Sequence, residues 1–132
     1  MWRVLIAFVL FAMIPTGSAL GHPPGEIELE FDLTEGELEI AAFHLVRDSS
    51  QHFVDRIVVK LKGDEIIEQI FSSQNDNRVQ IVEYTIIDAK PGDQIEVIAG
   101  CNISGRKTGS LIVEEKVEQE AEQDPEETED DQ

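Results

Sequence analysis

The chain has 132 residues, of which 41% are hydrophobic, and its 10 basic and 28 acidic side chains give a formal net charge of −18. This length suits one domain of ordinary size, and the hydrophobic content is sufficient for a core. Because both the body and the carboxyl-terminal tail are negative, the composition argues against nucleic acid and anionic lipid as partners. The same charge slows the approach of an anionic substrate unless a local positive patch exists.

The first 21 residues have the pattern of a secretory leader. Arg3 precedes an apolar run from Val4 to Ile14, which Pro15-Thr16-Gly17 interrupts. The run has about half of the roughly 20 residues that a membrane-spanning helix requires. We therefore expect a signal peptide at residues 1–21, a secreted or periplasmic protein, and no membrane span after cleavage.

Two positions fit the small-residue rule for cleavage of such a leader. One follows Gly17-Ser18-Ala19, and the other follows Ala19-Leu20-Gly21. Cleavage at the second position would make His22 the first residue of the mature protein.

Hydrophobic and polar residues alternate over most of residues 25–113, and no helical pattern competes with this period of two. Turn signals such as Thr34-Glu35-Gly36 separate the alternating segments. The expected strands are residues 27–33, 37–46, 53–62, 65–71, 78–87 and 94–101, with a seventh beginning at Ser110. Short strands at a spacing of about ten residues are typical of an immunoglobulin-like β-sandwich. We expect one all-β domain of this kind over residues 22–113.

Two of the expected strands carry a potential metal ligand on the face that should be buried. The core face of the second strand comprises Leu38, Ile40, Ala42 and His44. The core face of the sixth strand comprises Ile95, Val97, Ala99 and Cys101. The opposite face of the second strand is also apolar near its end, which indicates a central strand.

The tail over residues 114–132 has eleven acidic residues, one lysine and almost no apolar side chains. Such a segment cannot bury enough apolar surface to order itself, so we expect a disordered, solvated tail. A weak binding site for divalent cations and an interaction tail are the alternatives.

Cys101 is the only cysteine, and it stands where a strand ends and a loop flanked by Gly100 and Gly105 begins. Structural cysteines of exported proteins usually occur in pairs, and one cysteine cannot close an intrachain disulfide. Cys101 is therefore a buried inert thiol, an intermolecular bridge or a metal thiolate.

The chain has three histidines, His22, His44 and His52. Together with Cys101 they form a nitrogen and sulfur ligand set suited to iron, zinc or copper. Each histidine also has a simpler interpretation. His22 fits a flexible terminus, His44 a hydrogen-bonded core histidine, and His52 a surface residue.

Three segments resemble the superoxide reductase family of neelaredoxins and desulfoferrodoxins. They are His22-Pro23-Pro24, His44 followed by His52-Phe53-Val54-Asp55-Arg56-Ile57, and Cys101-Asn102-Ile103-Ser104-Gly105. The resemblance covers roughly residues 22–113. It implies a seven-stranded immunoglobulin-like domain with a mononuclear non-haem iron, held by four histidines and one cysteine thiolate.

Carried over to this sequence, the resemblance implies His22, His44 and His52 as equatorial ligands and Cys101 as the axial thiolate. Ser104 stands where the family has its fourth histidine. The spacing from His44 to His52 is longer than in the family, and Leu20-Gly21 replaces a lysine that attracts superoxide. Beside Cys101 and its loop, Arg106 and Lys107 form a small basic spot that could partly replace this lysine.

The sequence is therefore compatible with three functions. The resemblance implies an exported iron protein that reduces superoxide to peroxide, with superoxide or a small redox partner and an electron donor of unknown identity as its partners. A secreted carrier or sensor of copper, zinc or iron, without turnover, is the second. A metal-free extracellular sandwich that binds a protein partner is the third.

Overall fold

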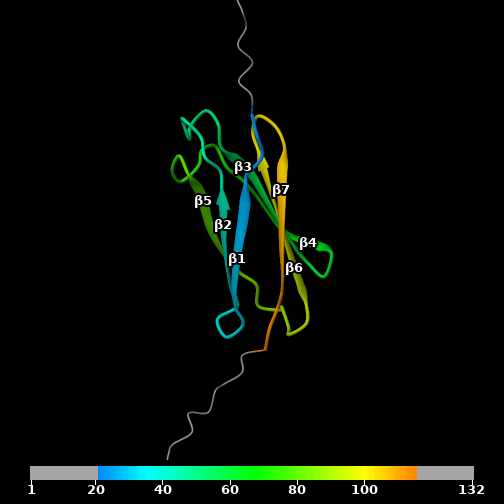
Figure 1. Cartoon of the computed structure of the whole chain (residues 1–132). Coiled ribbons are helices and arrows are strands. Elements are labelled where there is room, and N and C mark those ends of the chain that lie inside the picture. The colour runs from blue at the N-terminus through cyan, green and yellow to red at the C-terminus, as the bar shows by residue number, and fades with distance from the viewer. Residues whose placement is uncertain (1–20, 116–132) are drawn as a thin grey trace, which may run out of the picture.

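The computed structural model describes residues 21–115, which form two antiparallel β-sheets packed face to face (Figure 1). One sheet has the strand order β1-β2-β5 and the other the order β4-β3-β6-β7. The strands are β1 (Glu26–Asp32), β2 (Glu37–Phe43), β3 (Val54–Leu61), β4 (Asp64–Ile70), β5 (Val79–Thr85), β6 (Gln94–Cys101) and β7 (Arg106–Ile112). The expected seven-stranded, immunoglobulin-like all-β sandwich is confirmed. The expected signal peptide and acidic tail lie outside the described residues.

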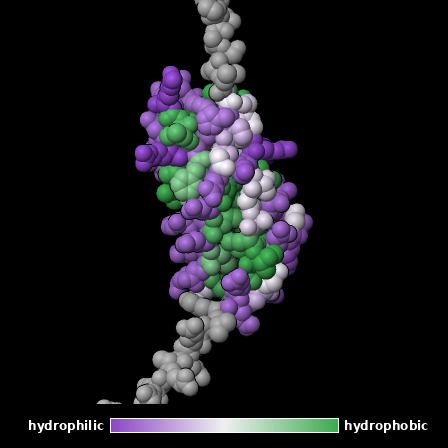
Figure 2. Space-filling view, viewed as in Figure 1, coloured by the Kyte–Doolittle hydropathy of each residue, from purple (hydrophilic) through white to green (hydrophobic). Residues whose placement is uncertain are grey.

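The core forms where the inward faces of the two sheets meet. The expected alternation is confirmed in β2 and β6, whose inward side chains Leu38, Ile40, Ile95 and Val97 are fully buried. Burying each such aliphatic side chain contributes about 1.5–3 kcal/mol to folding. Figure 2 shows hydrophobic surface over the middle of one face of the sandwich, flanked by hydrophilic side chains. Among the described residues, no helix is long and apolar enough to cross a membrane.

The prediction that the second strand is central is confirmed, because β2 lies between β1 and β5. It ends at Phe43, however, and not at residue 46. Pro23 and Pro24 precede β1, and proline has no backbone N–H with which to extend the pairing. The backbone N–H groups of His44 and Val46 donate to carbonyl groups of residues 78 and 77. The segment after β2 is thereby held against the loop that precedes β5.

The seventh strand begins at Arg106 and not at Ser110. Its first residues carry no alternating apolar pattern, yet they pair in register with the end of β6, from Ala99↔Lys107 to Gly100↔Arg106. Backbone hydrogen bonds at the edge of the sheet therefore define this part of the strand. As a result, the turn that follows Cys101 is only a few residues long.

Strand β3 has a register shift between Val54 and Arg56 in its pairing with β6. Simple alternation places Phe53 on the core face, but the shift places Val54 there instead, where it is fully buried. A β-bulge of this kind redirects the side chains beside it. His52 lies immediately before this irregular strand end.

Several connecting loops gather at the end of the sandwich where the described chain begins (Figure 1). They are the segments 44–53, 71–78 and 102–105. The described chain ends at the opposite end of the sandwich (Figure 1). This arrangement brings residues far apart in the sequence to one end of the domain.

Candidate metal centre

The three histidines meet at this end of the sandwich. The centroids of the His22 ring and the His44 ring are 4.8 Å apart, those of His22 and His52 are 4.9 Å apart, and those of His44 and His52 are 4.6 Å apart. One ring nitrogen from each histidine lies within 4.8 Å of the other two. The three side chains therefore lie close enough together to bind one metal ion.

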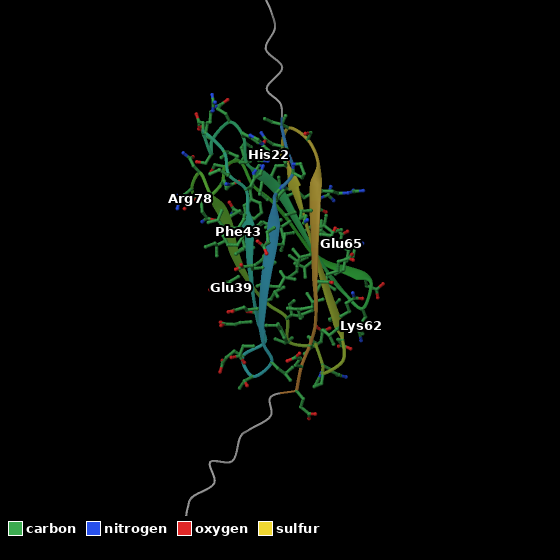
Figure 3. All side chains as sticks on the ribbon, in the orientation of Figure 1. His22, Glu39, Phe43, Lys62, Glu65 and Arg78 are labelled. Atoms are coloured by element: carbon green, nitrogen blue, oxygen red, sulfur yellow. The ribbon has the colours of Figure 1, made fainter. Side chains whose placement is uncertain are left out.

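His22 belongs to the segment before β1, and Figure 3 shows it at the end where the described chain begins. Close packing against the loop after Cys101 holds this segment. A Cβ atom built on Gly105, which has a φ of +82°, would lie 2.9 Å from Pro23. A Cβ atom on Gly21 would overlap the side chain of Ile103. Glycine at these two positions lets the His22 segment and the Cys101 loop pack together.

His44 directly follows β2 and continues its buried face, with only 1% of its surface exposed. Its Nδ1 atom is 3.0 Å from Oε1 of Gln74, and its Nε2 atom is 2.9 Å from the backbone oxygen of His22. Gln74 is itself buried. His44 is thus a hydrogen-bonded core histidine, as its simpler interpretation expects, and it also lies within the cluster.

His52 lies at the end of a tight turn in which its backbone N–H donates to the carbonyl group of Asp48. The hydroxyl and the backbone N–H of Ser50 donate to the Asp48 carboxylate, and these bonds lower the pKa of that carboxyl group. The pKa of His52 is also lowered, first by partial burial and then by the neighbouring rings of His44 and His22. The neutral ring that a metal ligand requires is thereby favoured.

Cys101 ends β6, and its sulfur adjoins the histidine cluster through His52. The His52 Nε2 atom is 3.1 Å from the Cys101 Sγ atom. The backbone N–H of Ile103 donates to the same sulfur at 3.4 Å. The donor atoms that all lie within 4.8 Å of one another belong to the three histidines. Cys101 therefore lies at the edge of this cluster.

Asn102 ties the loop after Cys101 to the loop that carries His52. Its side-chain oxygen accepts from the N–H of Phe53 at 2.9 Å, and its side-chain nitrogen donates to the carbonyl group of Gln51 at 2.9 Å. Its backbone N–H donates to the carbonyl group of Phe53. Three hydrogen bonds therefore set the position of Cys101 relative to His52.

The hydrogen-bond partners of two rings test whether the cluster fits a metal ion. Both ring nitrogens of His22 face backbone oxygens, of Pro23 at 3.0 Å and Leu45 at 3.1 Å. Both ring nitrogens of His44 also face oxygens. A neutral imidazole donates from only one nitrogen. In each neutral ring, one nitrogen donates its hydrogen to the oxygen that it faces. The other nitrogen has a lone pair that faces an oxygen with no hydrogen to donate, and this lone pair could bind a cation.

The spacing of the nitrogen and sulfur donors gives a second test. Metal–nitrogen and metal–sulfur bonds of about 2.1 and 2.3 Å separate two ligands of one ion by roughly 3.1 Å at a right angle. The observed separation of His52 and Cys101 is 3.1 Å. Imidazole and thiolate together suit iron, copper or zinc. The chemistry of the donors and the spacing of His52 and Cys101 thus fit such an ion. Two nitrogens bonded to one ion are at most about 4.2 Å apart, so the three ring nitrogens, which lie within 4.8 Å of one another, would draw slightly closer around it.

A groove of about 910 Å³ opens at the cluster and connects it to solvent. His22 and His52 line one part of it, together with Leu45, Arg47 and Ile103. Arg47 is exposed and places a positive side chain on the wall of the groove. The sequence pattern did not indicate Arg47 or Gln74, because both lie in loops that follow no periodic pattern.

Ser104, which the resemblance aligns with a fourth histidine ligand, lies exposed in the loop between Cys101 and β7. A hydroxyl group is not among the usual ligands of iron, zinc or copper in such nitrogen and sulfur sites. Within residues 21–115, the nitrogen and sulfur donors that the histidine cluster brings together are therefore three imidazoles and the adjoining sulfur of Cys101.

The fold and the donor set define a β-sandwich with a candidate transition-metal centre at one end. A comparison with protein families finds no family model that matches the chain, and a comparison with curated proteins finds no match.

Proposed function

We propose that this chain is an exported, superoxide reductase-like protein that holds one non-haem iron ion with His22, His44, His52 and Cys101. One observation carries the proposal: one ring nitrogen from each of the three histidines lies within 4.8 Å of the other two, and the single thiol lies 3.1 Å from His52. The resemblance of the three ligand-bearing segments to the superoxide reductase family supports iron and superoxide as the metal and substrate.

When bound, ferrous iron would supply one electron to superoxide, and two protons from solvent would complete hydrogen peroxide. The groove beside His22 and His52 admits a small anion from solvent. Arg47 supplies a positive side chain on the wall of this groove, and the Asp48 carboxylate on the same wall partly offsets its attraction for a negative substrate. An external electron donor must then return one electron for each superoxide reduced.

The sulfur of Cys101 tunes the potential of the centre through its own charge and its hydrogen bonds. The backbone N–H of Ile103 donates to this sulfur at 3.4 Å. Asn102 has its side-chain oxygen 4.0 Å from the sulfur. Gly105 accepts from the backbone N–H of Cys101. The bond between Cys101 and Gly105 helps to hold the sulfur beside His52, and the N–H of Ile103 partly neutralises the charge of a thiolate.

A secreted carrier of zinc or copper is the second candidate, and the number of donors favours it. Three imidazoles and one thiolate complete a four-coordinate site, which is the usual arrangement of a structural zinc. A reductase requires an additional open position for superoxide. The two functions therefore differ in whether the loaded protein reacts with superoxide.

The test begins with the metal content of the protein purified without added metal. The protein is then loaded with ferrous iron under anaerobic conditions and mixed rapidly with superoxide. We expect one iron per chain and metal-dependent consumption of superoxide without release of oxygen. Tight binding without any reaction would favour the carrier. Absence of stoichiometric metal, with stability unchanged by chelator, would favour the metal-free interaction module.

A further inference from the structure

Gln74 lies in the loop between β4 and β5, and its side chain makes four polar contacts. Its oxygen accepts from the backbone N–H of Val54 at 3.1 Å. Its nitrogen donates to the backbone oxygens of His44 at 2.8 Å and Asp76 at 2.9 Å. The fourth contact joins the same side-chain oxygen to Nδ1 of His44 at 3.0 Å. Gln74 is only 5% exposed, so solvent cannot replace these partners.

These partners determine the orientation of the amide. The N–H of Val54 can only donate, and the two backbone oxygens can only accept. Rotating the amide by half a turn would oppose donor to donor at Val54 and acceptor to acceptor at His44 and Asp76. The oxygen of Gln74 therefore faces Val54 and the ring of His44.

The orientation of Gln74 in turn determines the tautomer of His44. Because the oxygen of Gln74 has no hydrogen to donate, the proton must lie on Nδ1 of His44. The lone pair of the neutral ring is then on Nε2. This atom is 2.9 Å from the backbone oxygen of His22, which cannot donate to it. Buried polar atoms are nearly always paired, so this contact needs an explanation.

We propose that Gln74 is the positioning residue that fixes His44 in its Nδ1–H tautomer and so presents Nε2 to the metal ion. The inference rests on the proposed metal centre. Metal-binding histidines commonly donate their second ring nitrogen to such a partner, which orients the ring and raises its basicity. An ion bound at Nε2 displaces the backbone oxygen of His22, a residue that is exposed.

The first experiment measures the tautomer in the metal-free protein. A long-range nitrogen–proton correlation spectrum shows which ring nitrogen is protonated, and the chain has only 3 histidines. His44→Gln assigns the signals of that ring. We expect a proton on Nδ1 alone at neutral pH. A proton on Nε2 alone, or a ring protonated at both nitrogens, would overturn the inference.

The second experiment compares the affinity for Zn²⁺ of wild type, Gln74→Met and Gln74→Glu by chelator competition. Methionine has a similar length but offers no oxygen, so we expect the proton of His44 to move to Nε2 and the affinity to fall about 10- to 100-fold. Glutamate keeps the acceptor for Nδ1 of His44 but loses the donor to the backbone oxygens of His44 and Asp76, so we expect the Nδ1–H tautomer and part of the affinity to return. Wild-type affinity and tautomer in Gln74→Met would contradict the role of Gln74.

Gln80→Met is the matched control. Gln80 is also buried, at 4% exposure, and its side-chain oxygen accepts from the backbone N–H of Asn75. Its loss should destabilise the fold to a similar degree while leaving the affinity for Zn²⁺ within about 3-fold of wild type, because no ligand is reoriented. An equal loss of affinity in both variants would show that Gln74 acts only through stability.

The two proposals fail in different ways. If the wild-type protein binds neither Zn²⁺ nor Fe²⁺, the metal centre is refuted, and the role of Gln74 toward the metal fails with it. If it binds metal while His44 carries its proton on Nε2, the metal centre is retained and the inference about Gln74 is refuted.

Discussion

The Nε2 atom of His52 lies 3.1 Å from the Sγ atom of Cys101, although 49 positions separate the two residues in the chain. The pairing of β3 with β6 creates this contact, because His52 precedes β3 and Cys101 ends β6. A ring nitrogen just before β3 and a sulfur at the end of β6 thus share one end of the sheet.

Replacing Cys101 with serine should remove the thiolate and leave the histidines in place. We expect the iron-loaded Cys101→Ser variant to lose its sulfur-to-metal absorption and at least about 10-fold of its iron affinity, since a soft, charged ligand is removed. Visible spectra and chelator titrations measure both. Ser104→Ala, a change in the neighbouring loop, is the control and should behave as wild type. An unchanged spectrum for Cys101→Ser would exclude the sulfur from the metal site.

Alanine at position 105 should disturb both the fold and the site. Gly105 has a φ of +82°, and an added Cβ atom would lie 2.9 Å from Pro23, the neighbour of His22. We expect Gly105→Ala to lower the free energy of unfolding by about 2–4 kcal/mol, since strain of the backbone adds to steric overlap. Urea unfolding and chelator titration of Zn²⁺ measure the two effects.

Gly92→Ala is the matched control for this change. Gly92 has a φ of +88°, but nothing lies within 4 Å of an added Cβ atom. Its alanine variant should lose about 1 kcal/mol from backbone strain alone and keep its affinity for Zn²⁺. Equal losses of affinity in the two variants would contradict the link between the Cys101 loop and His22.

Much of the fold could be predicted from the sequence because strands with one buried face alternate strictly. The inward faces of β2 and β6 follow this period, and His44 continues the face of β2 into the core. The start of β7 could not be predicted in this way. Backbone pairing with β6 forms that part of the strand, and the side chains of Arg106 and Lys107 carry no sign of it.

Residue type and resemblance single out the three histidines in the sequence, but their spacing along the chain does not predict how they are arranged in space. Their convergence depends on loops at one end of the sandwich, whose paths are set by hydrogen bonds to individual groups. Gln74 illustrates the difference. Its role depends on contacts with His44, Val54 and Asp76 that only the folded chain brings together.

Asn102→Ala should weaken the affinity for metal more than it lowers the free energy of unfolding. The change removes the side-chain bonds to Phe53 and Gln51 but keeps the backbone bond from Asn102 to Phe53, so it loosens the Cys101 loop against the His52 loop. We expect a cost of about 1 kcal/mol, because Asn102 is exposed and water can replace the bonds, together with a several-fold weaker affinity for Zn²⁺. Asn75→Ala removes a similar exposed bond, to the N–H of Ile81, and should affect stability alone. A wild-type affinity for Asn102→Ala would contradict this role.

We expect the free energy of unfolding to fall at alkaline pH because of Tyr84. Its hydroxyl group, on β5, donates to the side-chain oxygen of Gln69, on β4, at 2.6 Å and so joins the two sheets. Partial burial raises the pKa of Tyr84 above its ordinary value of 10.0. Because the folded state holds this proton more tightly, its contribution to stability is complete below the unfolded pKa and is lost as pH rises through the folded pKa.

The single tyrosine of the chain makes this effect measurable. The ultraviolet absorbance of tyrosinate should appear at higher pH in the folded protein than in the protein unfolded in urea. The free energy of unfolding should also fall above about pH 10, more steeply than in Tyr84→Phe, which keeps the ring without the ionisable group. Gln69→Ala should bring the two titrations closer only slightly, because burial is the cause of the raised pKa. Coincident titrations of the folded and unfolded wild-type protein would contradict the partial burial of this hydroxyl group.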